Sequence, residues 1–160
     1  AILQASRFIE DSTENRRSTA QLLSAPEYLD APLDCIEPRL LGDYVDGLGN
    51  RWQDPHALRF HDDGEVNLPY LSDGMWFMTQ FRRWGLLRDD PDYLAVARQV
   101  QQLDLYKAAA SAVGIASSSR EMRSSQLIDG KTWDGSDPAG YARSFKLHAM
   151  SDSSPLLASR

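Results

Sequence analysis

The sequence predicts a predominantly helical fold, and three observations support this prediction. At least six segments place apolar residues three and four positions apart, which is the spacing of a buried helix face. Alternating strand patterns are scarce along the chain. The five valines are too few for the several Val- and Ile-rich strands of a complete doubly wound α/β domain. The chain is therefore either an all-helical domain or the helical part of an α/β protein.

Length and composition narrow the class of protein. A chain of 160 residues is long enough for one hydrophobic core, and 42% hydrophobic with 25% charged residues is ordinary for a globular domain. We expect residues 1–150 to form the helical portion and the Ser-rich residues 151–160 to be a disordered tail. No apolar run approaches the roughly 18 to 20 residues that span a bilayer. The formal net charge of −6 argues against nucleic acid as a direct partner, because phosphate backbones are held by Lys and Arg.

Two short helices in tandem are predicted at the amino-terminal end. An apolar helical pattern starts at Ile2, includes Phe8 and stops near Asp11. The spacing of Asp11 and Glu14 is that of a capping box, which predicts a second helix that reaches Leu23. Because no cap precedes the first apolar residue, we expect the chain to be the downstream part of a longer protein, with any export signal outside it.

A third helix is predicted from Pro32, at the first helical position, to Gly42, a natural helix end. Pro38 removes one backbone hydrogen bond within this span, so we expect a kink or a break there. Cys35, the single cysteine, has apolar neighbours and is expected to be a small core residue rather than a nucleophile. Residues 43–68 are rich in Gly, Asp, Asn and His and predict irregular structure. The buried face of the third helix is expected to hold Leu33, Ile36 and Leu40.

An aromatic helix is predicted between Ser72, as its N-cap, and Gly85, as its terminator. Phe77, Phe81 and Trp84 follow one another at four and three positions, so they form one apolar stripe. We expect this stripe to be part of the core rather than a ligand cage.

Three further helices are predicted in the carboxy-terminal half, with starts at Pro91, Asp104 and Pro138. Residues 115–136 show no clear period, and a structureless run of that length is uncommon inside a compact domain. We therefore expect this segment to wrap around the domain and to pack through Met122, Leu127, Ile128 and Trp133.

The histidines and acidic residues do not have the spacing of a metal site. None of His56, His61 and His148 lies four positions from a second ligand on a predicted helix. Residues 61–65 (HDDGE) place oxygen donors beside an imidazole, but they lack the alternating acidic spacing of an EF-hand. We interpret this segment as a solvated acidic turn, with a cation site as the alternative, and we expect no metal and no cofactor.

The sequence also lacks catalytic and phosphate-binding signatures. Residues 47–50 (GLGN) contain a G-x-G, but no lysine and no preceding strand, so they predict a turn. No G-x-S-x-G nucleophile elbow is present, and the carboxylates of an acidic chain are mostly solvated. We therefore expect a protein that is not an enzyme. Lys131 lies between two predicted turns and is expected to face solvent, with a position in a cleft as the alternative.

One long motif resembles a known family. Residues 63–73 (DGEVNLPYLSD), followed by Trp76-Phe77, Gln80 and Trp84-Gly85, are similar to a signature of the nitrate-binding subfamily of ABC-transporter solute-binding proteins, a group that also includes bicarbonate and sulfonate binders. Further agreement is found in residues 5–15, 28–32 (YLDAP), 92–94 (DYL) and 104–106 (DLY), so that the resemblance covers about residues 1–147. It implies the C-terminal helical part of a two-lobed, periplasmic-binding-protein-like α/β fold that holds an oxyanion between its lobes.

The resemblance implies nitrate or nitrite as ligand, an ABC permease as partner and the periplasm as location. The residues that anchor the anion in that family, among them a Trp, a Gln, a His and a Lys, match no position in this sequence, and we expect most of them to lie before Ala1. The best cationic or donor candidates near the motif are His61, Arg82 and Lys131. A half of a two-lobed protein bares apolar surface, so we also expect the isolated chain to form a homo-oligomer.

Two alternatives remain open at this point. The same family contains a cytoplasmic nitrate and nitrite sensor that lacks an export signal and controls an RNA-binding antiterminator, and residues 81–87 (FRRWGLL) and 133–138 (WDGSDP) resemble that group as closely. A signal sequence ahead of this chain would favour the carrier, and its absence would favour the sensor. The further alternative is an all-helical interaction module without a small ligand.

Overall fold

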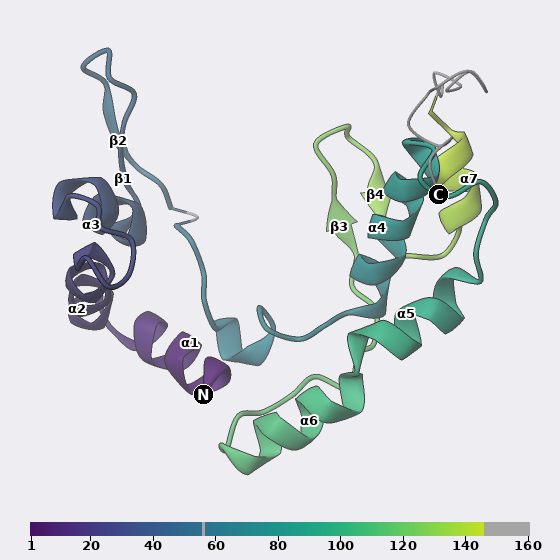
Figure 1. Ribbon diagram of the computed structural model, residues 1–160, viewed down its shortest axis with the longest axis horizontal. Coiled ribbons are helices and arrows are strands. Elements are labelled where there is room, and N and C mark those ends of the chain that lie inside the picture. The colour runs from purple at the N-terminus through teal and green to yellow at the C-terminus, as the bar shows by residue number, and fades with distance from the viewer. Residues whose placement is uncertain (56, 146–160) are drawn as a thin grey trace. The chain divides into compact units, whose positions relative to one another are not determined.

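The computed structural model describes residues 1–55 and 57–145, which fall into two compact units (Figure 1). Unit 1 comprises Ala1–Leu68 and Lys107–Ser118, and unit 2 comprises Pro69–Tyr106 and Ser119–Arg160. The described residues are mostly helical, as the sequence predicts. His56, His148 and the expected tail at 151–160 lie outside the described residues, so the domain prediction remains a prediction. Among the described residues, no helix is both long enough and apolar enough to cross a membrane.

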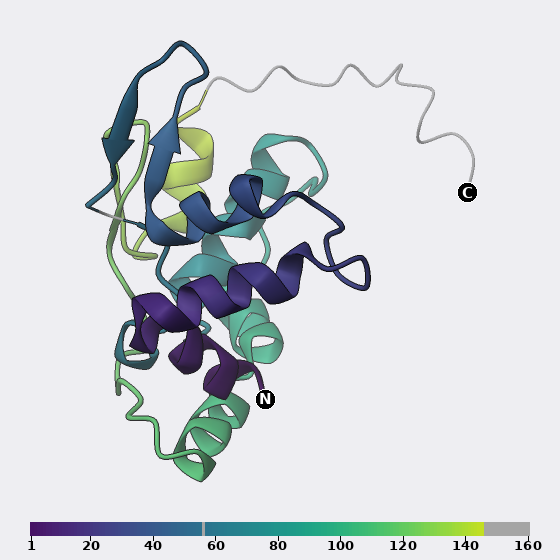
Figure 2. The ribbon, with the colours of Figure 1, turned by 90° about the vertical axis from the view of Figure 1, so that its left-hand side faces the viewer.

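Three helices begin unit 1: α1 (Ile2–Asp11), α2 (Thr13–Ser24) and α3 (Leu33–Leu41). Helices α2 and α3 pack side by side (Figures 1 and 2). The N-cap of α2 is Ser12, whose hydroxyl accepts from the Asn15 backbone N–H at 3.0 Å, so the predicted cap at Asp11 is wrong by one residue. Asp11 is still helical, whereas Ser12 has extended dihedrals that turn its hydroxyl toward the third residue of the helix.

Helix α3 bears on three predictions. The helix runs through Pro38 without a break and ends at Gly42, whose φ of +82° is the left-handed conformation expected of a helix end. Cys35 is exposed, so its predicted place in the core is wrong. Successive helical residues are about 100° apart, which puts Cys35 roughly 140° around the helix from the buried Leu40. Leu33 is also exposed, so the buried face of α3 is narrower than predicted.

A short hairpin follows α3, where the sequence predicts irregular structure. Strands β1 (Asp43–Val45) and β2 (Arg51–Gln53) pair antiparallel (Figure 2). The rings of Tyr44 and Trp52 stack with centroids 5.7 Å apart. The predicted turn at residues 47–50 connects the strands and is confirmed. Strands of three residues are too short to produce an alternating pattern, which explains the missed hairpin.

Helix α4 (Leu71–Arg83) is the central element of unit 2, where it packs against α5 (Tyr93–Gln101) and α7 (Pro138–Arg143). Strands β3 (Ser125–Gln126) and β4 (Thr132–Trp133) form a second hairpin, drawn beside α4 in Figure 1. Helix α6 (Leu103–Ala112) contains the boundary between the two units.

Ser72 does not cap α4 as predicted. Its side chain is fully buried in the first turn, and its hydroxyl accepts from the backbone N–H of Arg123 at 3.0 Å. The Ser72 carbonyl accepts from the Trp133 indole at 2.9 Å. Segment 115–136 therefore packs on α4, as its expected wrapping role implies, through Trp133. Ile128, by contrast, is fully exposed near the tip of the β3–β4 hairpin, so its predicted packing is wrong.

Local capping signals in unit 2 are confirmed in part. Asp104 is predicted to cap the helix that follows α5, but it lies inside α6, which begins at Leu103. Asp137 caps α7 by accepting from the Gly140 backbone N–H at 2.9 Å, next to Pro138 at the first helical position. Helix α5 begins two residues later than predicted, with Asp92 as its cap. Pro91 and Asp92 lie outside the helix, and Asp92 has non-helical dihedrals (φ −71°, ψ 87°), so α5 starts at Tyr93.

The aromatic stripe of α4 faces solvent in the described chain, which contradicts its predicted place in the core. Phe77 is 57% exposed, Phe81 40% and Trp84 61%. At about 100° per residue, these three side chains lie within roughly 60° of one another and opposite Met75 and Thr79. The face that α4 buries consists of Leu71, Ser72, Met75, Thr79 and Gln80.

Candidate functional site

The three predicted ligand residues fall in two places. His61 belongs to unit 1, whereas Arg82 and Lys131 belong to unit 2.

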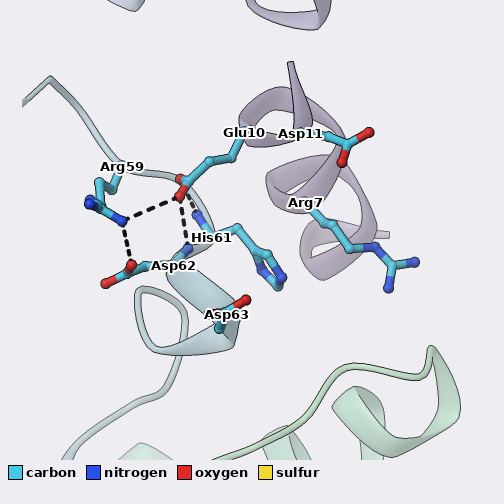
Figure 3. A pocket seen from close by; sticks show the side chains of 7 residues that line it. All are labelled: Arg7, Glu10, Asp11, Arg59, His61, Asp62 and Asp63. Atoms are coloured by element: carbon cyan, nitrogen blue, oxygen red, sulfur yellow. Dashed lines mark hydrogen bonds and ion pairs between the residues drawn. The ribbon is translucent and has the colours of Figure 1, made fainter. Parts of the chain in front are cut away.

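His61 borders an open hollow of about 300 Å³ in unit 1 (Figure 3). The hollow lies between α1 and the short 3-10 helix η1 (Asp62–Gly64). Figure 3 shows that Glu10 points from α1 toward the loop, while the guanidinium of Arg7 points away from it. The lining residues are Arg7, Glu10, Asp11, Arg59, His61, Asp62 and Asp63.

The centre of this arrangement is the Glu10 carboxylate. It accepts three backbone hydrogen bonds, from Phe60 at 2.5 Å, from His61 at 2.8 Å and from Asp62 at 3.1 Å. Asp62 and Asp63 have φ values of 45° and 54°, a left-handed backbone that follows these amides. Successive N–H groups that converge on one point form an anion-binding concavity. In this protein the concavity holds a carboxylate of the chain itself.

The electrostatics of the hollow are consistent with an ionised Glu10. Partial burial acts to raise the pKa of Glu10, but the N–H groups of His61, Phe60 and Asp62, together with the charge of Arg16, hold that pKa below its ordinary value. The Arg59 guanidinium lies 2.5 Å from the Asp62 carboxylate and 3.9 Å from Glu10.

The hydrogen bonds of Glu10 therefore hold α1 and η1 together. The Nδ1 atom of His61 is buried without a hydrogen-bond partner in the described part of the chain. Within residues 1–55 and 57–145, no three His, Cys, Asp or Glu side chains are grouped to hold a metal ion. The donors that an external anion would use here are already occupied by Glu10.

Arg82 lies in an ion-pair network around Asp90 in unit 2. The Arg82 Nε atom is 3.4 Å from one Asp90 oxygen, and an Arg143 guanidinium nitrogen is 3.0 Å from the other. The Tyr93 hydroxyl donates to the same carboxylate at 2.9 Å. Burial, with the hydrogen bond and negative charge of Asp90 added, raises the pKa of Tyr93 to about 12.

Lys131 lies against aromatic rings rather than in a cleft. Its Nζ atom donates to the Ser144 hydroxyl at 2.6 Å and is 4.3 Å from the centroid of the Phe145 ring. The Arg83 guanidinium carbon is 3.4 Å from the same centroid. Both contacts have the geometry of cation–π interactions.

The structure thus assigns Arg82 and Lys131 to separate contacts within unit 2. Asp90, Arg143 and Glu10 are the charged residues that sequence reasoning missed. Asp90 stands before Pro91 and carries the pattern of a helix start, while Glu10 sits within a helix that gives no local sign of a partner 51 residues later. These residues come together only in three dimensions, for which a single sequence holds no signal.

Comparison with known proteins connects the fold to a family. No protein-family profile matches the chain. The nitrate/nitrite binding protein NrtA of a Nostoc species is 32% identical over 152 residues, which cover 92% of this chain and 34% of the relative. NrtA of Synechococcus elongatus is also 32% identical, over 94% of this chain and 34% of the relative. The nitrate import ATP-binding protein NrtC of a Synechocystis species is 27% identical over 92% of this chain and 22% of its own length.

A solved structure gives the same result. The crystal structure of the periplasmic nitrate-binding protein NrtA from Synechocystis superposes with a TM-score of 0.76 at 31% identity, over 90% of this chain and 38% of that chain. The chain spans about a third of the length of the curated NrtA relatives that it matches. The 160-residue chain is therefore homologous to the NrtA nitrate-binding proteins and has the fold of a predominantly helical part of their periplasmic-binding-protein-like structure.

Proposed function

We propose that this chain is the helical portion of an oxyanion-binding solute-binding protein that serves an ABC uptake system, with nitrate or nitrite as its ligand. The observation that carries the proposal is the match to periplasmic NrtA, which holds over 90% of the chain in structure and at 31% identity in sequence. The motif at residues 63–73 lies within the matched length. The proposed location is the periplasm, and the proposed partner is the ABC permease.

The contribution of this chain to anion binding is mainly architectural, which means that it supports the fold rather than contacting the anion. Two lobes that close on an oxyanion replace its water with fixed donors, and this requires parts of the fold that lie outside a third of NrtA. Two arginines of the candidate sites are already engaged in ion pairs, Arg82 with Asp90 and Arg59 with Asp62. We retain His61, Arg82 and Lys131 as proposed donors. To bind an anion, Arg82 would have to give up its contact with Asp90, and Lys131 its contact with Ser144.

Calorimetric titration tests the proposal directly. The complete gene product that contains these 160 residues is expected to release or absorb heat on addition of nitrate or nitrite, and a titration without heat for both anions would sink the proposal. The 160-residue chain alone is expected to bind either anion only feebly. Submillimolar affinity of the chain alone would contradict the architectural role.

The cytoplasmic sensor is the second candidate, and the similarity of residues 81–87 and 133–138 to that group supports it. A complete gene product without a signal sequence that binds an antiterminator in a nitrate-dependent manner would replace the carrier by the sensor. The match to NrtC supports a third candidate, in which this portion is joined to an ATP-binding protein. A nucleotide-binding domain in the complete gene product would identify that case.

A further inference from the structure

Residues 58–62 form a loop that we call the nest loop, because its backbone N–H groups surround the carboxylate that α1 supplies. The loop is held by other bonds as well. The Arg16 side chain on α2 donates to the Leu58 carbonyl at 2.9 Å, and the Asn67 amide donates to the Phe60 carbonyl at 2.8 Å. Neither bond involves the α1 carboxylate, so the nest loop is tied to α2 and to Asn67 independently of α1.

The nest loop presents hydrogen-bond donors to Glu10. The backbone N–H groups of Phe60, His61 and Asp62, here called the nest amides, donate to the carboxylate at 2.5, 2.8 and 3.1 Å. An Arg59 guanidinium nitrogen lies 3.9 Å from the same carboxylate. A protonated carboxyl group carries an O–H that must itself donate, and its oxygens accept more weakly than those of the anion. The loop therefore binds the ionised side chain in preference to the protonated one.

Charged and titratable groups near Glu10 come from α1, from the nest loop with η1, and from α2. Partial burial acts to raise the pKa of Glu10, but the nest amides and the charge of Arg16 on α2 hold that pKa below its ordinary value of 4.5. The surroundings as a whole therefore favour the anion. The other groups that line the hollow with Glu10 are Arg7, Asp11, Arg59, His61, Asp62 and Asp63.

Glu10 is the side chain that connects α1 firmly to a distant part of unit 1. Ser6 also reaches that far, but its hydroxyl lies 3.5 Å from the Asn67 side-chain oxygen, at the limit of a hydrogen bond. The Asn15 side chain donates to the Phe8 carbonyl at 2.7 Å, but Asn15 belongs to α2, the next helix. Loss of the Glu10 contact would therefore free the end of α1 from the nest loop without breaking its connection to α2.

We propose that Glu10 and the nest loop form a pH-sensitive switch, in which protonation of Glu10 releases the end of α1 from the loop while α2 and α3 stay folded. The contact is fully present above the ordinary pKa of Glu10 and is lost as the pH falls through the lower pKa of the folded state. Because the nest loop keeps its bonds to Arg16 and Asn67, it stays in place and can receive the carboxylate again when the pH rises. All of these contacts lie inside unit 1, and none of them depends on which ligand the protein binds.

Hydrogen exchange at residue resolution, followed by mass spectrometry, tests the switch in the complete gene product that contains these 160 residues. Protection of the nest amides, corrected for the intrinsic effect of pH on amide exchange, is expected to fall by about tenfold per pH unit below the folded pKa of Glu10. The Asp54 N–H, which donates to the Gly42 carbonyl at 2.8 Å in the same unit, is the reference and is expected to keep its protection. Unchanged protection of the nest amides at about pH 3 overturns the proposal. A parallel loss at Asp54 overturns it too, because unit 1 would then unfold as a whole.

Three variants assign the effect to Glu10. Glu10→Gln should show at pH 7 the weak nest-amide protection that the parent shows in acid, with little further change, because its side chain stays neutral. Glu14→Gln, which removes an α2 carboxylate that lies 4.0 Å from Arg17, should behave like the parent. His61→Gln should keep the acid-induced loss, since the nest uses the backbone of that residue. Full protection in Glu10→Gln, or absence of the pH dependence in Glu14→Gln or in His61→Gln, would each overturn the proposal.

Discussion

Trp133 donates its indole N–H to the backbone carbonyl of Ser72 at 2.9 Å, which joins the β3–β4 hairpin to the first turn of α4. The indole is 4% exposed, and its ring also lies 5.0 Å from that of Tyr141. One side chain therefore connects three elements that are far apart in the sequence.

Replacement of Trp133 by alanine should strongly destabilise unit 2. Loss of a buried aromatic side chain costs about 3–5 kcal/mol, and the Ser72 carbonyl also loses a donor. Urea unfolding followed by circular dichroism measures the change. Trp52→Ala is the matched control, because Trp52 is half exposed and its loss should cost about 1 kcal/mol or less. Similar losses for the two variants would contradict the central role of Trp133.

The lowered pKa of Glu10 should make the stability of the fold depend on pH in the acid range. The folded pKa of Glu10 lies below its ordinary value of 4.5, so its contribution is fully present above that value and is lost as the pH falls through the folded pKa. Glu10→Gln should therefore reduce stability at pH 7, by about 1.5–3 kcal/mol as for a hydrogen bond to a charged group, and reduce it less at pH 3. Unfolding curves at the two pH values measure this difference. Parallel losses at both pH values would show that the charge of Glu10 does not matter.

The raised pKa of Tyr93 should make the stability of the fold depend on pH in the alkaline range. Its folded pKa is raised to about 12, whereas an unfolded tyrosine titrates near 10. The folded state therefore loses stability between about pH 10 and 12, where the unfolded chain releases the proton first. Absorbance at 295 nm should show a late tyrosine titration, and Tyr93→Phe should reduce its amplitude by one tyrosine. A late phase of unchanged amplitude in the variant would contradict the assignment to Tyr93.

Loss of the N-cap of α2 should lower the stability of the fold by a small amount. Ser12→Ala removes the acceptor for the Asn15 N–H and should cost about 1 kcal/mol. Ser18→Ala, at an exposed position within the same helix, should be neutral or slightly stabilising because alanine favours helix. Thermal unfolding of the two variants against the parent chain tests the contrast, and equal effects would remove Ser12 from its capping role.

Features set by neighbours in the sequence were predictable. Gly42 ends α3 and Asp137 caps α7 because each acts within a few residues of its own position. Which face of α4 is buried was not predictable. Phe77 and Trp84 on one side and Met75 on the other give the helix two apolar sides, and periodicity does not say which of them the chain buries. Such a choice is made by tertiary contacts.

The contacts of the candidate site were even less predictable from the sequence. The sequence indicated His61 as a donor, but the group that occupies its loop is Glu10, from a helix 51 residues earlier. Ser72 has a side chain typical of an N-cap, but its hydroxyl accepts a hydrogen bond from the Arg123 N–H, again 51 residues away. Hydrogen bonds of that range depend on how the chain folds back, which single-residue propensities do not encode.

The exposed position of Cys35 has a practical consequence. It is the single cysteine of the chain and lies on the surface of α3 in unit 1. A maleimide spin label or fluorophore would therefore attach at one defined place without prior removal of other thiols. The label would report on unit 1, and a second cysteine placed at the fully exposed Ile128 in unit 2 would allow the distance between the two units to be measured in the same sample.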